Sequence, residues 1–169
     1  MRMATLLSLV VVTVFLGASL PAQAQQPVAP PPPQIPYGAP ISLEQTKKVL
    51  AGAEAEAKKN KWNMVIVVLD SGGHPVMLER MDGTQLGSIE AAKDKAYSAV
   101  LYRRPTKVFQ DLVAGGGANL RLLKLSGADP IEGGIPLVVE GKIVGAVGVS
   151  GAASEQDAQV AKAGAESLK

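Results

Sequence analysis

His74 is the one histidine of the chain, and it limits the chemistry open to this protein more than any other residue. With a single histidine and no cysteine, one chain offers no His-x-x-x-His metal motif, no apparent Ser/His/Asp set and no thiolate. His74 follows two glycines and precedes Pro75, which is typical of a surface turn. A turn histidine can be solvated without a role, or it can serve as an exposed metal ligand or proton donor. We take His74 as the candidate metal ligand.

Three basic residues lie close together at the end of a predicted helix. Arg103, Arg104 and Lys107 fall within five residues of sequence, interrupted by Pro105. Two guanidiniums and one ammonium at this spacing suit an anion such as a carboxylate or a propionate. Residues 80–83 (RMDG) precede the same helix, and we assign them to the same anion-binding cluster. The alternative is that the basic residues are solvated and only offset the helix dipole.

Acidic residues offer a second chemistry, proton transfer. Asp82, Glu132 and Asp157 could act as acid and base in an enzyme for a small organic acid, with the arginines orienting the substrate. Glu132 shares the loop at residues 129–136 (DPIEGGIP) with Asp129, and these two carboxylates could instead ligate a metal ion. No histidine accompanies them, so a solvated loop is the simpler interpretation.

Gly145, Gly148 and Gly151 repeat every third residue before the last predicted helix. The repeat resembles a dinucleotide-binding fingerprint only superficially, because two of the glycines lie inside a strand and the spacing is not G-x-G-x-x-G. Glycines within a strand more often allow a helix or a neighbouring backbone to approach closely. We therefore expect this glycine repeat to serve packing.

The first 24 residues have the pattern of a signal peptide. A basic residue precedes an apolar run at residues 4–20, and Ala22 and Ala24 are small residues suited to a cleavage site. The run is short and ends at a proline, so a permanent membrane anchor is the less favoured alternative. We predict cleavage after Ala24 and a mature protein that is periplasmic or secreted.

A proline-rich linker is expected between the signal peptide and the folded domain. Residues 25–41 hold most of the prolines of the chain, which favours an extended spacer of the polyproline type. The remaining residues, 42–169, are long enough for one domain.

Composition excludes several classes of function. The chain has 17 Lys and Arg against 15 Asp and Glu, whereas binding to nucleic acid or to anionic lipid requires a basic excess. Aromatic residues make up 4% of the sequence, so extended stacking platforms for bases are not expected. Without cysteine the exported domain has no disulfides and must fold on its apolar core alone.

Hydrophobic periodicity predicts the elements that position these residues. Ser42 with Gln45 forms a capping box at the start of the first helix. Ser88 is expected to cap the second long helix, and Ser154 with Asp157 the last. The predicted elements are, in order, a helix at 42–59, strands at 64–69 and 76–81, helices at 88–104 and 105–113, strands at 119–123, 137–139 and 143–150, and a helix at 154–168.

These elements predict a single domain of the α+β class. Short turns at residues 70–73 and 140–141 join neighbouring strands into two hairpins. The strand at 64–69 is unbroken and rich in β-branched residues, so it should be buried on both faces. We expect a largely antiparallel, five-stranded sheet flanked by helices, with the element order α-β-β-α-α-β-β-β-α.

Several motifs in this order resemble those of the GlcG/HbpS family, and the resemblance covers residues 42–169. The motifs are residues 68–74 (VLDSGGH), 80–83 (RMDG), 103–106 (RRPT), 131–136 (IEGGIP) and 145–151 (GAVGVSG) with 155–157 (EQD). The resemblance implies a haem-binding or haem-degrading type of domain, related to the C-terminal domain of PduO-type proteins. It also implies an antiparallel sheet flanked by helices and assembly into homo-oligomers.

The sequence departs from the haem-binding members of this family in its available iron ligands. The first helix holds no histidine, and Lys58 and Lys59 stand there instead. Haem iron could be ligated by His74, or by one of three alternatives, or not at all. The alternative ligands are Met81, Tyr97 and Tyr102.

The interpretation that the sequence favours is an exported, homo-oligomeric binding protein for haem or a similar flat carboxylated ligand. His74 is then the metal ligand, and Arg103, Arg104 and Lys107 are the partners of the propionates. Oligomerisation is also suggested by the small residues Ala92, Ala96 and Ala99 on one helix face, which could allow close packing between subunits. The alternative is an enzyme that acts on a small organic acid by carboxylate acid/base chemistry.

Overall fold

The computed structural model describes residues 34–168, so the predicted signal peptide and most of the predicted linker lie outside the described residues. The elements of this region follow the predicted order, except that a 3₁₀ helix replaces the predicted strand at residues 119–123. The elements are α1 (Leu43–Asn60), β1 (Val65–Asp70), β2 (Pro75–Arg80), α2 (Gly87–Tyr102), α3 (Lys107–Ala114), the 3₁₀ helix η1 (Gly117–Lys124), β3 (Gly134–Val139), β4 (Lys142–Ser150) and α4 (Ser154–Glu166).

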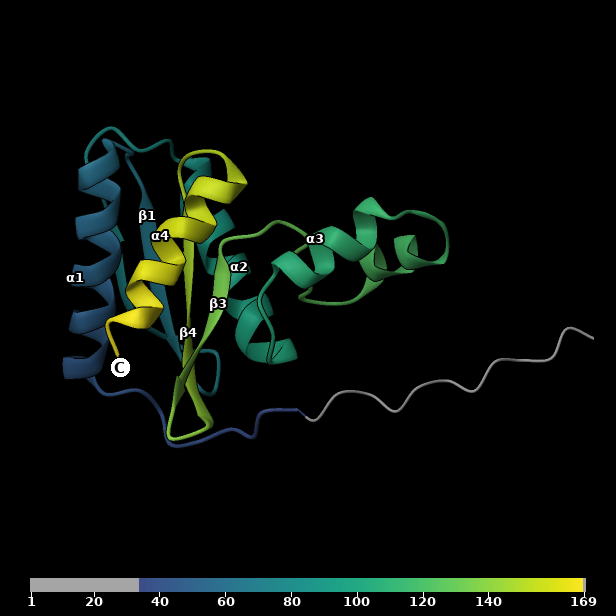
Figure 1. Ribbon diagram of the computed structural model, residues 1–169, viewed down its shortest axis with the longest axis horizontal. Helices are drawn as coiled ribbons and strands as arrows, with labels where there is room; N and C mark the ends of the chain where they lie inside the picture. Colours follow the sequence, from purple (N-terminus) through teal and green to yellow (C-terminus); the bar gives the residue numbers. More distant parts are fainter. Residues whose placement is uncertain (1–33, 169) are drawn as a thin grey trace, which may run out of the picture. The chain divides into compact units, whose positions relative to one another are not determined.

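The described residues form one four-stranded sheet with the strand order β2-β1-β4-β3. Every neighbouring pair in the sheet is antiparallel. Both predicted hairpins are present, since β1 continues into β2 and β3 into β4 through short turns (Figure 1). The predicted α+β class is therefore confirmed, whereas the predicted number of five strands is wrong.

The missing fifth strand is the segment predicted at residues 119–123, which is part of the 3₁₀ helix η1. Two glycines with positive φ, Gly116 and Gly117, lead into this helix and turn the chain away from the sheet. Its leucines are not β-branched, and none of its residues is buried. The short run of leucines therefore has no sheet to join.

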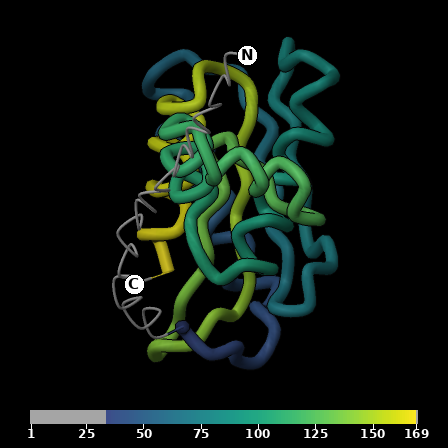
Figure 2. Tube along the Cα trace, turned by 90° about the vertical axis from the view of Figure 1, so that its right-hand side faces the viewer, coloured from purple at the N-terminus to yellow at the C-terminus, as the bar shows by residue number. Residues whose placement is uncertain are grey.

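Helices cover both faces of the sheet (Figures 1 and 2). On one face, α1 and α4 pack against the largest apolar cluster, which includes Val49, Ile66 and Val160. On the other face, α2 packs against Val65 and Val67 of β1. Strand β1 is buried on both faces, as its unbroken apolar sequence predicts. None of the described helices combines the length and the apolarity needed to span a bilayer.

The start of α1 agrees with the predicted capping box. The Gln45 backbone N–H donates to Ser42 Oγ at 3.2 Å, and the Ser42 N–H donates to Gln45 Oε1 at 3.0 Å. The predicted cap at Ser88 is wrong, because α2 begins at Gly87 and no side chain caps it. Ser88 is instead buried, and its hydroxyl lies 3.3 Å from Ser150 Oγ of β4.

The start of α4 also differs from the prediction. Ala153, not Ser154, is the N-cap residue, and its N–H donates to Gln156 Oε1 at 3.1 Å. The Asp157 carboxylate turns into the protein and accepts the Ala152 N–H at 3.1 Å. This orientation brings a carboxylate below the surface, beside α2 and β4.

Glycines in β4 allow the backbones of α2 and β1 to approach closely, as the packing interpretation of the repeat predicts. A Cβ on Gly148 would lie 2.0 Å from the Ala92 carbonyl oxygen, and one on Gly145 would lie 2.2 Å from the Leu69 carbonyl oxygen. Ala92, Ala96 and Ala99 are fully buried against the sheet. This alanine face therefore packs inside the domain, and the suggestion that it contacts another subunit is wrong.

Candidate functional site

His74 lies in the β1–β2 turn, which the carboxylate of Asp70 stabilises. Asp70 Oδ1 accepts the backbone N–H of Gly72 at 2.8 Å and that of His74 at 2.9 Å. Burial alone would raise the pKa of Asp70, but these backbone hydrogen bonds outweigh it and lower the pKa. The His74 side chain is 81% exposed, with Nδ1 3.4 Å from Asp70 Oδ1. The imidazole is thus held near a carboxylate and remains accessible to a ligand.

Tyr97 and Leu101 lie on the outer face of α2, next to this turn. Each is about two-fifths exposed, so both side chains are accessible to a ligand. The Tyr97 ring occupies the space beside Gly73, where a Cβ would lie 3.1 Å from the ring. We call the surface formed by Tyr97 and Leu101 the Tyr97 shelf.

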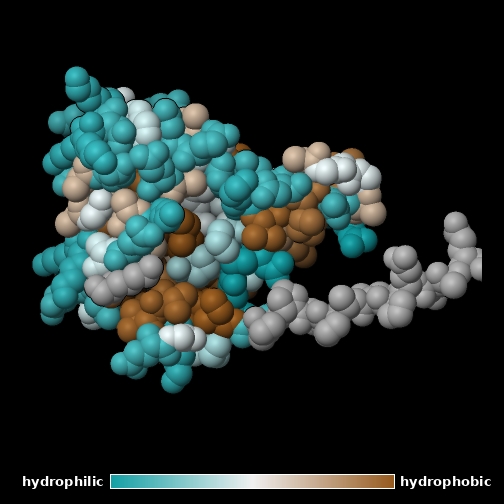
Figure 3. Space-filling view, viewed as in Figure 1, coloured by the Kyte–Doolittle hydropathy of each residue, from teal (hydrophilic) through white to brown (hydrophobic). Residues whose placement is uncertain are grey.

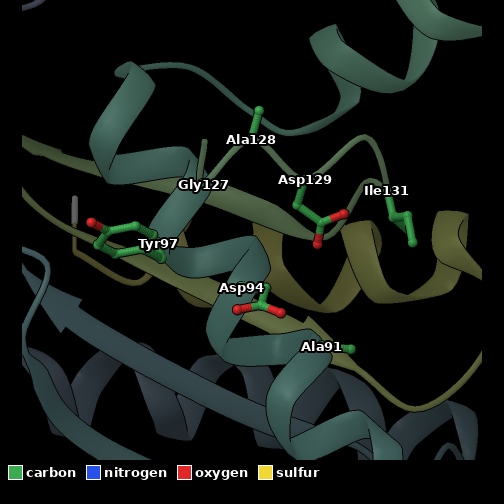
Figure 4. A pocket seen from close by; sticks show the side chains of 7 residues that line it. All are labelled: Ala91, Asp94, Tyr97, Gly127, Ala128, Asp129 and Ile131. Carbon is green, nitrogen blue, oxygen red and sulfur yellow. The ribbon is translucent and has the colours of Figure 1, made fainter. Parts of the chain in front are cut away.

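Two cavities adjoin the Tyr97 shelf, and Tyr97 lines both of them. The smaller, about 110 Å³, lies beside the β1–β2 turn and is lined by Tyr37, Ser71, Gly72, Gly73, Tyr97, Val100 and Leu101. The larger, about 400 Å³, lies between α2 and the loop before β3 (Figure 4), and is lined by Ala91, Asp94, Tyr97, Gly127, Ala128, Asp129 and Ile131. The shelf and its cavities form a continuous surface with carboxylates at one end.

The loop that forms the outer wall of the larger cavity donates backbone hydrogen bonds to side chains of α2, of α3 and of the N-cap residue of α3. The Asp129 N–H donates to Ser98 Oγ at 2.9 Å. Further along, the Glu132 N–H donates to Gln110 Oε1 at 2.9 Å, and the Gly134 N–H donates to Thr106 Oγ1 at 3.0 Å. The wall is therefore a defined part of the structure.

A buried ion pair lies behind this loop. Lys95 of α2 is 2% exposed, and its Nζ donates to Asp157 Oδ2 at 2.7 Å and to the Val149 carbonyl at 3.1 Å. Burial raises the pKa of Asp157, and the hydrogen bond and charge of Lys95 oppose this effect. A Cβ on Gly133 would lie 3.0 Å from Lys95 Nζ. The consecutive glycines of the loop thus make room for the lysine.

Lys95 is not among the residues that the sequence motifs single out, although the sequence held a signal for it. It lies three residues after Ala92 and four before Ala99, so a helix places it on the same face as these buried alanines. A charged residue on a predicted buried face requires a partner of opposite charge. That partner, Asp157, lies 62 residues later in the sequence, and only the fold shows that the two side chains meet.

The Asp129 carboxyl has an unusually high pKa for an aspartate. Burial raises the pKa of Asp129 to about 6; the charge of Lys95 opposes the rise, and that of Asp94 adds to it. The carboxyls of Asp94 and Asp129 lie on opposite walls of the larger cavity (Figure 4). The Asp129 carboxyl can therefore hold or release a proton near neutral pH.

Replacement of Asp129 by asparagine should stabilise the domain at pH 7.5 but not at pH 4. The folded-state pKa lies above the ordinary value of 3.8, so the native state is destabilised as the pH rises from about 4 to 6. The asparagine side chain carries no charge, and we expect the free energy of unfolding to rise by about 1 kcal/mol at pH 7.5, allowing for partial solvent screening. Urea denaturation at both pH values measures the difference. Asp82→Asn, at an exposed position, is the control, and equal effects of Asp129→Asn at both pH values would contradict the expectation.

The three basic residues of the predicted anion cluster have different partners, and their side chains do not converge on one binding site. The Arg103 guanidinium lies over the Tyr37 ring, 5.3 Å from its centroid, and so next to the smaller cavity. Arg104 lies over the Phe109 ring at 5.6 Å. Lys107 forms an ion pair with Asp111 at 2.8 Å. Of the three, Arg103 is the one placed beside the shelf.

The other predicted site residues lie elsewhere. Asp82, in the RMDG motif, lines a separate cavity of about 400 Å³ with Lys58 and Asn63. This motif precedes α2, whereas Arg103 follows it, so the length of the helix separates the two. Glu132 is buried and lies 3.4 Å from Gln110 Nε2. Asp82, Glu132 and Asp157 therefore do not form a common acid/base site.

The alternative iron ligands differ in their accessibility. Met81 packs against the main apolar cluster. The Tyr102 hydroxyl donates to the Ser126 carbonyl, and its ring packs edge-on against Phe109 at 5.2 Å. Tyr97 is the most open of these side chains. Within the part of the chain that the structure describes, no three His, Asp or Glu side chains are placed to hold a metal ion together.

The fold and this surface define an antiparallel α+β domain with an exposed aromatic site on its second helix. The chain belongs to the HbpS-like family, because the family model described as haem degrading protein HbpS-like matches residues 41–166. Protein GlcG of Escherichia coli (strain K12) is 41% identical over 110 residues, which cover 65% of this chain and 81% of GlcG. The predicted resemblance is confirmed.

Two solved structures support the same relationship. A double mutant of HbpS from Streptomyces reticuli superposes with a TM-score of 0.71 at 29% identity, covering 86% of this chain and 99% of that one. A complex of PduOC with haem superposes with a TM-score of 0.69 at 26% identity, covering 76% of this chain and 95% of that one.

Proposed function

We propose that this protein is an exported, oligomeric binding protein for haem or a similar flat carboxylated ligand, and that the ligand lies on the Tyr97 shelf. The observation that carries this proposal is the position of the shelf between an exposed imidazole and a guanidinium. His74 lies beside the smaller cavity, and Arg103 stacks on its wall residue Tyr37. The His74 imidazole, which can ligate a metal, and the Arg103 guanidinium, which can pair with a carboxylate, thus flank one apolar surface.

The chemistry of these residues fits haem. Imidazole is an iron ligand, exposed apolar and aromatic side chains can cover a porphyrin face, and a guanidinium can pair with a propionate. Arg103 follows Tyr97 by six positions along α2 and its C-cap, which corresponds to about 9 Å of helix rise. Bound haem would supply a redox-active iron at the shelf, and His74 would hold that iron through its imidazole.

The comparisons support haem as the ligand. The matching family model is described as haem degrading, and one of the similar structures is a complex with haem. A single histidine per chain limits each subunit to one imidazole, so a bis-histidine site would require two subunits.

Titration of the mature protein with haem should give a saturable Soret band. His74→Ala should shift or abolish this band, because it removes the iron ligand. Arg103→Ala should leave the ligand-field bands unchanged and weaken binding by about 1 kcal/mol, since this side chain is partly exposed. Absorption spectra and the dissociation constant separate the two effects.

Lys162→Ala provides a control for loss of a surface cation, because Lys162 lies on α4, on the other face of the sheet. An unchanged spectrum in the His74 variant would transfer the ligand role to Tyr97, to another side chain or to water. Absence of saturable binding by the wild-type protein would refute haem as the ligand.

An arm formed by α3 and η1 is our candidate for the contact between subunits. The arm extends away from the sheet (Figure 1), and apolar side chains gather on it (Figure 3). Phe109 is the one buried residue of α3, and η1 has none. The exposed large apolar residues of the arm are Val108, Leu112, Leu120 and Leu123. Exposed apolar residues in this number are typical of an interaction surface.

Native mass spectrometry of protein recovered from the periplasm or the medium tests export and assembly together. We expect subunits that begin at Gln25 and that form a complex of several chains. Subunits that retain residues 1–24 would contradict export, and a single-chain mass at micromolar concentration would contradict oligomerisation.

A second candidate function is proton transfer on a small organic molecule in the larger cavity. The specific observation in its favour is the Asp129 carboxyl, whose pKa of about 6 suits a group that exchanges protons near neutral pH. Asp94 lies on the same cavity. This candidate becomes the better one if the wild-type protein fails to bind haem.

A further inference from the structure

Residues 36–41 fall in the predicted linker, yet they are bonded to the sheet. The Gly38 N–H donates to the Ile143 carbonyl at 2.8 Å, and the Ile143 N–H donates to the Pro36 carbonyl at 2.9 Å. The Ile41 N–H donates to the Val144 carbonyl at 2.8 Å. Tyr37 lies between these bonds and forms a parallel bridge with Ile143. Its backbone is therefore fixed against β4.

The Tyr37 side chain reaches from this segment to the C-terminal end of α2. Its hydroxyl donates to the Val100 carbonyl at 2.8 Å and lies 3.1 Å from the Leu101 carbonyl. These are among the last carbonyls of the helix, and the Val100 carbonyl also accepts the Arg103 N–H at 3.4 Å. Tyr37 thus ties the N-terminal segment to the end of the shelf.

The same ring holds Arg103. Arg103 has a φ of 53°, so the chain turns sharply out of α2 at this residue. The turn places the guanidinium carbon 5.3 Å from the centre of the Tyr37 ring. Among the described residues, no carboxylate or carbonyl accepts a hydrogen bond from this guanidinium. The ring occupies one face of the cation and leaves its N–H edges available to an anion.

We propose that Tyr37 is a positioning residue of the ligand site, which holds the Arg103 guanidinium at the edge of the Tyr97 shelf to receive a carboxylate of the ligand. This inference rests on the proposed binding of a flat carboxylated ligand. It assigns residues 36–41 to the binding site and gives the N-terminal segment a role beyond that of a spacer. Tyr37 acts through Arg103, because its own hydroxyl is engaged by α2.

A double-mutant cycle with two forms of haem tests this proposal. Tyr37→Ala, Arg103→Ala and the double variant are titrated with haem and with haem dimethyl ester, in which both propionates are esterified. Tyr37→Ala should weaken binding of haem about threefold to tenfold, and so should Arg103→Ala. The double variant should be no weaker than Arg103→Ala alone, because Tyr37 acts through the guanidinium.

The dimethyl ester distinguishes positioning from a merely structural role. It has no carboxylate for Arg103, so Tyr37→Ala should not change its affinity. Tyr37→Phe retains the ring and should restore most of the affinity for haem. Ile35→Ala, immediately before this segment, is the matched control, and thermal unfolding of each variant shows whether the domain still folds.

Four results would overturn the inference. Equal losses with haem and with the ester would show that Tyr37 only supports the fold of the site. Additive losses in the double variant would show that Tyr37 and Arg103 act independently. Wild-type binding without any effect of Tyr37→Ala would refute the inference alone, whereas failure of the wild-type protein to bind haem would overturn both the inference and the proposed function.

Discussion

Replacement of Lys95 by methionine is expected to destabilise the domain by about 3–5 kcal/mol, a large part of the stability of a domain of this size. Lys95 and Asp157 have side chains that are only 2% and 3% exposed, and their charged atoms lie 2.7 Å apart. Removal of the ammonium leaves the Asp157 carboxylate buried without its partner, and the Val149 carbonyl loses a donor. Urea denaturation at neutral pH measures the loss.

Lys93→Met provides a matched control on the same helix. Lys93 forms an exposed ion pair with Glu90 at 2.8 Å, and its removal should cost less than about 1 kcal/mol. Asp157→Asn added to Lys95→Met should recover part of the stability, because it removes the unpaired charge and keeps an oxygen for the Ala152 N–H. Equal losses for Lys93→Met and Lys95→Met would show that burial of the pair does not matter.

Replacement of Gly148 by alanine is expected to destabilise the domain by about 3 kcal/mol or more, although it adds only one methyl group. The added Cβ would lie 2.0 Å from the Ala92 carbonyl oxygen and 2.6 Å from the Ala96 nitrogen. Both atoms belong to the backbone of α2, so a side-chain rotation cannot relieve the clash. The helix would have to move away from the sheet, and the melting temperature, measured by circular dichroism, should fall accordingly.

Gly87→Ala is the control for this substitution. Gly87 begins α2, and nothing lies within 4 Å of a Cβ at this position. The same chemical change should therefore be neutral or should stabilise by up to about 1 kcal/mol, because alanine has less freedom in the unfolded chain. A Gly148 variant as stable as the wild type would contradict the close approach of α2 to β4.

The central elements could be predicted from the sequence because each has a local signal. Strand β1 is a continuous apolar run, and α1 has a capping box that the structure confirms. The hairpin turns contain glycines that adopt positive φ, Gly73 and Gly141 among them. These signals depend on neighbouring residues only, so they do not require knowledge of the fold.

The segment at residues 119–123 could not be predicted in the same way. Its leucines satisfy the apolar requirement of a strand, but strand formation requires a partner edge. The outer edges of the sheet belong to β2 and β3, and neither of them pairs with this segment, which follows the turn at Gly116 and Gly117 away from the sheet. Pairing across the sheet is a property of the whole chain, and a local pattern does not contain it.

The candidate site shows the same division. His74 and Arg103 could be selected by residue type and by their place next to a turn or a helix end. Tyr37 could not, since its partners Val100 and Leu101 are more than sixty residues away. Asp129 gains its unusual acidity from burial between elements that only the folded chain brings together.

The pairing of β1 with β4 also determines when the chain can fold as it is made. Val67 of β1 pairs with Gly148 of β4, so the central strand waits for the last strand of the sheet to leave the ribosome. Until then, the apolar run of β1 has no cover on its β4 side and remains accessible to chaperones. The complete sheet can therefore form only after most of the chain has been synthesised.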